Sequence, residues 1–235
     1  MNPPLEKDGE KNYKVDVIIA AWNEEEGIGM TLAEMQRNCK PKNVLVIDGH
    51  STDRTVEIAK DMGAQVFIQD GIGKGDAISK AIRHIDSDVD YIVVTDADFT
   101  YPAKYIQKMI QILENNPSVG MVSGNRFNEH AEKRALINLF YFGNRLLALA
   151  HNLLNGINLQ DPLTGLRVIR AQILRDWKVK SQGFDIEVEL NHQVERKGYG
   201  IIEVPIRYRK RLGEKKLKAS HGATVLKRIL LETTY

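Results

Sequence analysis

The chain contains a single cysteine, Cys39, among its 235 residues. One thiol excludes an internal disulfide framework and a zinc site built from several cysteines, and it is typical of a reducing, intracellular compartment. The six histidines show no metal-ligand spacing, and no serine stands in a G-x-S-x-G elbow. The sequence therefore supports neither a histidine metal centre nor a hydrolase triad.

Long apolar runs are also lacking. No window reaches 18 uninterrupted apolar residues, so we expect no membrane-spanning helix within this sequence. Residues 1–14 are polar and lack the apolar core of a signal peptide, which indicates a flexible leader. Residues 219–235 are expected to form a C-terminal helix, and its abrupt end leaves open a membrane segment further downstream. Residues 15–218 are expected to form one domain.

Neither positive nor negative charge is in large excess, since the chain has 33 Lys and Arg residues and 31 Asp and Glu residues. Such a balance gives no global field for nucleic acid, and no nucleic acid partner is expected. The one strongly basic run, residues 207–218, holds seven Lys or Arg residues, one Glu and only Tyr208 as a stacking residue. A solvated loop and a loop that closes over a phosphate both remain open.

The first half of the sequence alternates β-branched runs with helical patterns. The runs 15–21, 43–48, 64–69 and 90–96 predict strands joined by helices, hence an α/β fold with a mostly parallel, Rossmann-like sheet flanked by helices. In such sheets ligands bind beyond the carboxyl ends of the strands. The unusual polar residues follow the strands at that edge: Asn23, Glu24, Asp48, Lys74, Asp96 and Asp98.

Several element boundaries are predicted from local signals. Asn23 with Glu26 is expected to cap the first helix, Ser51 the second, and Pro102 is expected to open the fourth. Residues 199–211 are read as a strand. A long amphipathic helix over about 133–154 is consistent either with an interfacial helix or with a core helix packed on the sheet.

Asp96 and Asp98 stand one residue apart directly after a buried strand. Adjacent carboxylates repel unless a positive group lies between them, and they converge only if the chain turns there. Two hard oxygen ligands suit Mg²⁺ or Mn²⁺. The alternative is a turn in which Asp98 caps the helix that begins at Pro102.

Residues 71–77, GIGKGDA, place three glycines around Lys74 at a helix start. Backbone N–H groups and an ammonium in this arrangement can bind a phosphate. The stretch does not match the P-loop pattern, and a flexible turn is the alternative.

Taken in order, the segments AAWNEEEGI, VIDGHSTDRT, GKGDA, VVTDADFTYP, SGNRF, DPLTGLRVI, GFDIEVEL and RYRKRLGEKKL resemble family 2 glycosyltransferases of the GT-A fold. The resemblance extends over about residues 15–218 and is strongest to dolichol-phosphate mannose synthases and archaeal polyprenyl-phosphate glycosyltransferases.

The resemblance implies a metal site at Asp96 and Asp98 for Mg²⁺ or Mn²⁺. It implies an acceptor-phosphate site at Arg126 and Arg134. It further implies a nucleotide-sugar site at Ala21, Asn23, Glu24, Asp48, Lys74, Asp96, Ala97, Asp98, Arg211 and Lys216. The last two fall in a loop that covers the diphosphate in such enzymes.

The activity implied is inverting transfer of a hexose, mannose or glucose, from GDP-mannose or UDP-glucose to dolichyl or polyprenyl phosphate. Such an enzyme would act as a peripheral protein on the cytoplasmic face of the membrane. A soluble or glycan hydroxyl acceptor is the alternative, for which Glu187, Glu189 or Asp161 could serve as base. A third hypothesis is a nucleotide-binding module whose basic tail docks on RNA or an anionic membrane. The chain departs from the family pattern at Ala20, Trp22, Gly49, Asn125 and Thr100, which leaves the nucleotide and the sugar open.

Overall fold

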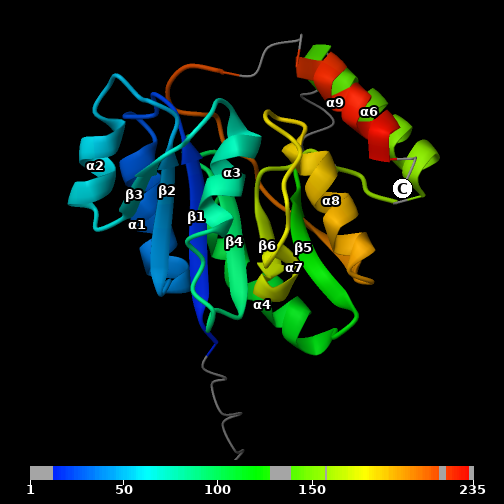
Figure 1. Cartoon of the computed structure of the whole chain (residues 1–235), viewed down its shortest axis with the longest axis horizontal. Helices are drawn as coiled ribbons and strands as arrows, with labels where there is room; N and C mark the ends of the chain where they lie inside the picture. Colours follow the sequence, from blue (N-terminus) through cyan, green and yellow to red (C-terminus); the bar gives the residue numbers. More distant parts are fainter. Residues whose placement is uncertain (1–12, 128–138, 157, 217–220, 233–235) are drawn as a thin grey trace, which may run out of the picture.

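A seven-stranded sheet forms the centre of the computed structural model, which describes residues 13–127, 139–156, 158–216 and 221–232 (Figure 1). The strands lie in the order β3-β2-β1-β4-β6-β5-β7, and β6 alone runs antiparallel to its neighbours. Their bounds are β1 Val15–Ala21, β2 Asn43–Asp48, β3 Gln65–Ile68, β4 Tyr91–Asp96, β5 Val119–Asn125, β6 Arg167–Arg170 and β7 Gly200–Pro205. The prediction of one α/β domain with a mostly parallel sheet is confirmed.

Helices connect the strands and cover both faces of the sheet. They are α1 Ile28–Cys39, α2 Thr55–Asp61, α3 Lys74–Ile82, η1 Ala103–Tyr105, α4 Ile106–Asn115, α6 Leu139–Asn155, α7 Ala171–Leu174, α8 Ile186–Arg196 and α9 His221–Glu232. Helices α1, α2 and α4 contribute to the core on one face, and α3, α7 and α8 to the core on the other. A sheet covered on both faces explains why the strands read as nearly continuous apolar runs.

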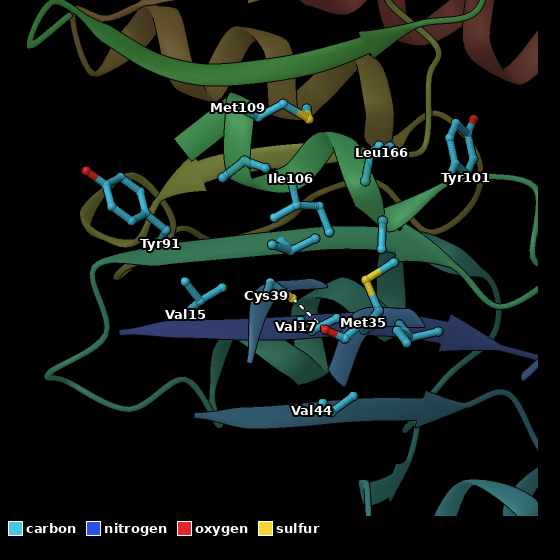
Figure 2. Close-up of a cluster of buried hydrophobic side chains, with 14 of the residues drawn as sticks. Val15, Val17, Met35, Cys39, Val44, Tyr91, Tyr101, Ile106, Met109 and Leu166 are labelled. Atoms are coloured by element: carbon cyan, nitrogen blue, oxygen red, sulfur yellow. Dashed lines mark hydrogen bonds between the residues drawn. The ribbon is translucent and has the colours of Figure 1, made fainter. Parts of the chain in front are cut away.

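Alternate residues of β1 show this division. Val15 and Val17 belong to the core beneath α1 and α4, whereas Ile18 faces α3 and α8. Figure 2 shows the first of these cores, where Val17 lies among side chains of α1 and α4. Cys39 is buried there and its thiol donates to the Met35 carbonyl, so the one cysteine serves packing.

Helices α6 and α9 lie side by side outside the sheet, next to α8 (Figure 1). Val225 and Ile229 of α9 are buried against Val188 of α8 and are joined by the partly buried Leu147 of α6. The interpretation of this region as a core helix packed on the sheet is wrong, because α6 packs mainly on α9 and several of its leucines are exposed. No helix within the described ranges is long and apolar enough to cross a membrane.

Two of the predicted helix starts are wrong. Helix α1 begins at Ile28, five residues after Asn23, and α2 begins at Thr55, four residues after Ser51. The two expected caps bond elsewhere: the Asn23 N–H donates to Ser51 Oγ at 2.8 Å, and Asn23 Oδ1 accepts from the Thr52 N–H at 2.8 Å. Cap-type side chains here join two loops, because both loops meet at the same edge of the sheet.

Three further boundaries differ from expectation. The fourth connection starts with the 3₁₀ turn η1 after Pro102, and α4 follows from Ile106. Strand β7 ends at Pro205, so the basic run lies in an irregular segment. The described part of the amphipathic helix begins at Leu139, and the expected residues before it lie outside the described ranges.

Candidate active site

The turn after β4 brings the two aspartates together. Phe99 adopts a left-handed conformation, with φ 64°, directly after Asp98. Thr31 of α1 fixes the turn from below, since its hydroxyl donates to the Ala97 carbonyl and accepts from the Phe99 N–H, each at 3.1 Å. The turn that convergence of the two carboxylates requires is therefore present, and the strain at Phe99 is offset by these contacts.

Lys74 provides a positive charge beside Asp96. Its Nζ lies 2.6 Å from Asp96 Oδ1 and 2.7 Å from Glu187 Oε1, and the lysine side chain is 9% exposed. Burial opposes the charge, but the carboxylates of Asp96 and Glu187 outweigh it and raise the pKa of Lys74. The lysine is thus an ammonium ion shared between β4 and α8.

Asp98 lies deeper than Asp96 and is bound through one oxygen. Its Oδ1 accepts from both the N–H and the hydroxyl of Thr100, at 3.1 and 2.5 Å, so Asp98 does not cap the helix after Pro102. Burial, followed by the charge of Asp96, raises the pKa of Asp98. The Arg211 guanidinium lies near the other oxygen, with its Nη1 3.6 Å from Asp98 Oδ2.

The basic segment 206–216 passes over this turn and is bonded to it. The Arg209 N–H donates to the Thr100 carbonyl at 3.0 Å, and the Leu212 N–H donates to the Asp98 carbonyl at 3.1 Å. The Arg209 guanidinium stacks over the Phe99 ring at 4.2 Å and forms a bidentate pair with Glu34. These bonds argue against a freely solvated loop at Arg209 and Leu212, whereas Arg207 and Lys210 of the same run are exposed.

The second terminal nitrogen of the Arg211 guanidinium, Nη2, binds Glu24. Arg211 Nη2 donates to Glu24 Oε1 at 2.6 Å, and the second oxygen, Oε2, is buried without a partner in the described chain. Burial raises the pKa of Glu24 to about 7, although the arginine beside it acts in the opposite direction. A carboxyl group near half-protonation at neutral pH is common at functional sites.

The remaining residues expected at the nucleotide lie at the ends of β1 and β2. Asp48 is buried; its Oδ2 accepts from the Ser51 N–H, and its Oδ1 has no partner in the described parts. Lys216 lies over the ring of Trp22, which is 52% exposed. Ala21 and Ala97 are buried, so their side chains present little surface.

Arg126 lies at the end of β5, where it is bound to a carboxylate. Its Nε and Nη2 each donate to Asp161 at 2.7 Å, and its N–H donates to the same group at 2.9 Å. The guanidinium also lies 5.6 Å from the ring centre of Tyr208. Arg126 as a ligand of the acceptor phosphate stays a prediction, and Arg134 lies outside the described residues.

Sequence reasoning missed residues that shape the site without carrying charge. A side chain at Gly165 would bring its Cβ to 2.5 Å from Asp96 Oδ2, and one at Gly27 to 2.7 Å from the Ala97 carbonyl. The Gly165 N–H donates to the hydroxyl of Tyr101 at 2.7 Å. Gly165 stands in the segment DPLTGLRVI, one of the ordered motifs, but its contact with Asp96 joins positions 69 apart and carries no local signal.

A divalent cation fits the two aspartates. Lys74 takes one oxygen of Asp96 and Thr100 takes one of Asp98, which leaves Oδ2 of each without a hydrogen bond from the described chain. Asp98 is buried beside a second negative charge, and a cation would relieve that repulsion. No group of three or more His, Cys, Asp or Glu side chains in the described ranges is arranged to hold a metal ion, so the protein would supply two ligands and a substrate the rest.

Comparisons with known proteins place these observations in a family. The chain is 36% identical to "Dolichyl-phosphate hexose transferase" of Haloferax volcanii over 213 residues, which cover 89% of each protein. It is 25% identical to "Dolichol-phosphate mannosyltransferase" of Pyrococcus furiosus, covering 87% of this chain and 59% of that protein.

Solved structures agree on the fold. Glucosyl-3-phosphoglycerate synthase from Mycobacterium tuberculosis, in complex with Mn²⁺, UDP and glucosyl-3-phosphoglycerate, superposes with a TM-score of 0.74 at 18% identity, covering 94% of this chain and 80% of that one. The same enzyme has been solved with Mg²⁺ and UDP. The family model "Glycosyl transferase family 2" matches residues 16–177, which contain β1 to β6 and both aspartates. The resemblance noted from the ordered motifs is confirmed, and the chain belongs to glycosyl transferase family 2.

Proposed function

We propose that this protein transfers a hexose from a nucleotide sugar to a dolichyl or polyprenyl phosphate, with inversion at the sugar. The main support is the match to a dolichyl-phosphate hexose transferase, which covers 89% of both chains. The site adds a chemical argument, since a carboxylate pair lies beneath a cationic segment at the carboxyl ends of the strands.

The donor diphosphate would lie between the aspartates and the segment 206–216. Mg²⁺ or Mn²⁺ held by Asp96 and Asp98, when bound, supplies charge that stabilises the departing nucleoside diphosphate. Arg211 is in reach of the same place, 3.6 Å from Asp98, and Lys216 extends from the same segment. We propose that Arg211 exchanges Glu24 for the diphosphate when the donor binds.

The acceptor needs no strong base if it is a phosphate, because it is already an anionic nucleophile. Of the three carboxylates considered as a base, Asp161 is held by Arg126, and Glu189 accepts the N–H groups of Lys180 and Ser181. The third, Glu187, binds Lys74 through one oxygen and keeps the other without a partner in the described chain. Arg126, and Arg134 beyond the described ranges, are the proposed ligands of the acceptor phosphate.

A lipid acceptor requires a membrane-facing surface, and we propose the outer side of α6 and α9, together called the leucine face. Its exposed leucines include Leu146, Leu149, Leu153, Leu154 and Leu226, each 42% to 75% exposed. Two adjacent amphipathic helices with apolar outer sides suit the interface of a bilayer. A peripheral position on the cytoplasmic side, where nucleotide sugars are available, completes the proposal.

The test is transfer of radiolabelled sugar from GDP-mannose and from UDP-glucose into a short polyprenyl phosphate, with Mg²⁺, Mn²⁺ or EDTA. Label in the lipid fraction that disappears with EDTA is the expected result and identifies the donor. Metal-dependent hydrolysis of the donor without lipid labelling would instead favour a soluble acceptor. Absence of turnover of both donors, with each metal, would contradict the proposal.

A further inference from the structure

Glu187 in the first turn of α8 has one carboxylate oxygen engaged and one free. Oε1 accepts from Lys74 Nζ at 2.7 Å, whereas Oε2 is buried and has no hydrogen-bond partner in the described chain. The side chain is 8% exposed, so bulk water is a poor substitute for a partner. An orphaned carboxylate oxygen accepts hydrogen bonds only, and it therefore suits a ligand group that donates one.

The Glu187 carboxylate is held in place by the turn that carries Lys74. The Gly75 N–H donates to the Gln182 carbonyl at 2.8 Å, and a Cβ at Gly75 would lie 2.2 Å from the Ser181 carbonyl oxygen. The turn is thus docked directly on the segment that leads into α8. Since Lys74 Nζ bonds both Asp96 and Glu187, the two carboxylates are held next to each other.

The chemistry of the site distinguishes the possible occupants. If Asp96 and Asp98 carry the donor diphosphate through a cation, Glu187, which Lys74 holds beside Asp96, is adjacent to the place of the diphosphate and within reach of the sugar attached to it. A hexose presents hydroxyl groups that donate hydrogen bonds. The acceptor phosphate presents only anionic oxygens, which a carboxylate repels, and its proposed cation is Arg126 at the end of β5.

We infer that Glu187 Oε2 accepts a hydrogen bond from a hydroxyl of the transferred hexose and so helps to select the sugar. This inference rests on the proposed function, because it takes a nucleotide hexose as the donor. Lys74 compensates the charge of Glu187, so the contact costs little electrostatically. A site built to bind a hydroxyl discriminates strongly against a sugar that lacks it.

The primary test is calorimetric binding of UDP-glucose, GDP-mannose, UDP and GDP with Mg²⁺ and without acceptor. In Glu187→Gln the amide oxygen can remain on Lys74, which turns the NH₂ group toward the sugar and removes the acceptor. We expect about tenfold weaker binding of the preferred nucleotide sugar and unchanged binding of the matching nucleoside diphosphate. Glu195→Gln, an exposed change on the same helix, is the control and should leave both affinities unchanged.

Two results would overturn the inference. Equal weakening of the nucleotide sugar and of the nucleoside diphosphate would show that Glu187 acts on the diphosphate site through Asp96. Unchanged binding of the nucleotide sugar together with loss of transfer to polyprenyl phosphate would show that Glu187 acts on the acceptor, as a base, instead.

A second measurement identifies the hydroxyl. The wild type should transfer sugar most slowly from one of the four monodeoxy donors (2-, 3-, 4- and 6-deoxy). Glu187→Gln should transfer from that deoxy donor and from the unmodified nucleotide sugar at equal rates. If the wild type binds the nucleotide sugar but labels no polyprenyl phosphate, the proposed function fails while calorimetry still decides the role of Glu187. If the wild type binds neither nucleotide sugar, both fail.

Discussion

Arg211 and Glu24 are 187 positions apart in the sequence, yet Arg211 Nη2 donates to Glu24 Oε1 at 2.6 Å. The pair ties the segment 206–216 to the loop after β1, and the same arginine lies 3.6 Å from Asp98. The guanidinium that we propose as a ligand of the diphosphate is therefore bound by Glu24 and lies near Asp98. Two of our predictions concern this arrangement directly.

Glu24 should make the stability of the protein depend on pH. Its pKa is about 7 in the folded chain against an ordinary value of 4.5, so the folded state binds the proton more strongly than the unfolded state. This stabilising contribution is complete below about pH 4.5 and is lost as the pH rises through about 7. As the pH rises from about 4.5 to 7, the free energy of unfolding of Glu24→Gln, followed by thermal melts, should increase relative to that of the wild type by about 2 kcal/mol. Glu26→Gln, an exposed neighbour, should follow the wild type, and parallel curves for all three proteins would contradict the assignment.

Asp98→Asn should reduce transfer by at least about 100-fold without loss of the fold, because the second cation ligand is lost while the bonds to Thr100 can persist. The measurement is transfer together with a thermal melt, and with calorimetric titration of Mn²⁺ in the presence of UDP. Asp61→Asn, an exposed change at the end of α2, is the matched control and should retain full activity. Full activity of Asp98→Asn would exclude the metal assignment.

The sequence was sufficient for the first four strands, but it did not predict the antiparallel β6 between β4 and β5 or the connections within the site. β1 and β2 were predicted with their observed bounds, because β-branched runs between helical patterns carry a strong local signal. Asn23 and Ser51 were misassigned because each is a good cap by local rules, while the fold uses them to join two loops. Such a choice depends on tertiary contacts that no short window contains.

The partners of Asp96 and Asp98 also depend on tertiary contacts and could not be predicted from local sequence. Lys74 was expected near the nucleotide from its glycine-rich turn, yet its bonds to Asp96 and to Glu187 join positions 22 and 113 apart. The coverage of the site by residues 206–216 likewise depends on backbone bonds of Arg209 and Leu212 to the turn after β4. The basic run is visible in the sequence, but only the fold shows that it lies over the turn after β4.

Arg126 and Asp161 should be strongly coupled in stability. Asp161 is fully buried and receives three hydrogen bonds from Arg126, two of them from the guanidinium. Arg126→Ala keeps the backbone N–H bond but removes the positive charge beside a buried carboxylate, and it should cost about 3 to 5 kcal/mol. The double variant Arg126→Ala, Asp161→Ala should be destabilised by less than the sum of the single changes, by about 1 kcal/mol or more. Urea unfolding of the four proteins measures this coupling. Additive effects would mean that the pair contributes no specific interaction.

Arg126→Lys tests the proposed acceptor contact separately. Lysine keeps the charge, but a single ammonium cannot bind Asp161 as Nε and Nη2 of the guanidinium do and also present a further N–H group to a phosphate. We expect a several-fold higher KM for polyprenyl phosphate and an unchanged KM for the nucleotide sugar. An effect confined to the donor would place Arg126 on the other substrate.

The leucine face of α6 and α9 should carry the membrane affinity. Leu149 and Leu153 are 54% and 75% exposed on α6, and Leu226 is 42% exposed on α9, so serine at these positions removes apolar surface that the fold does not bury. Insertion of one leucine into the interface contributes on the order of 1.5 kcal/mol, which is about a tenfold change in partitioning. Each single change should therefore weaken cosedimentation with phosphatidylglycerol vesicles by up to tenfold while the melting temperature stays the same. Ile72→Ser, at a residue 85% exposed in the loop after β3, is the matched control, and an equal loss there would show that the protein docks through another surface.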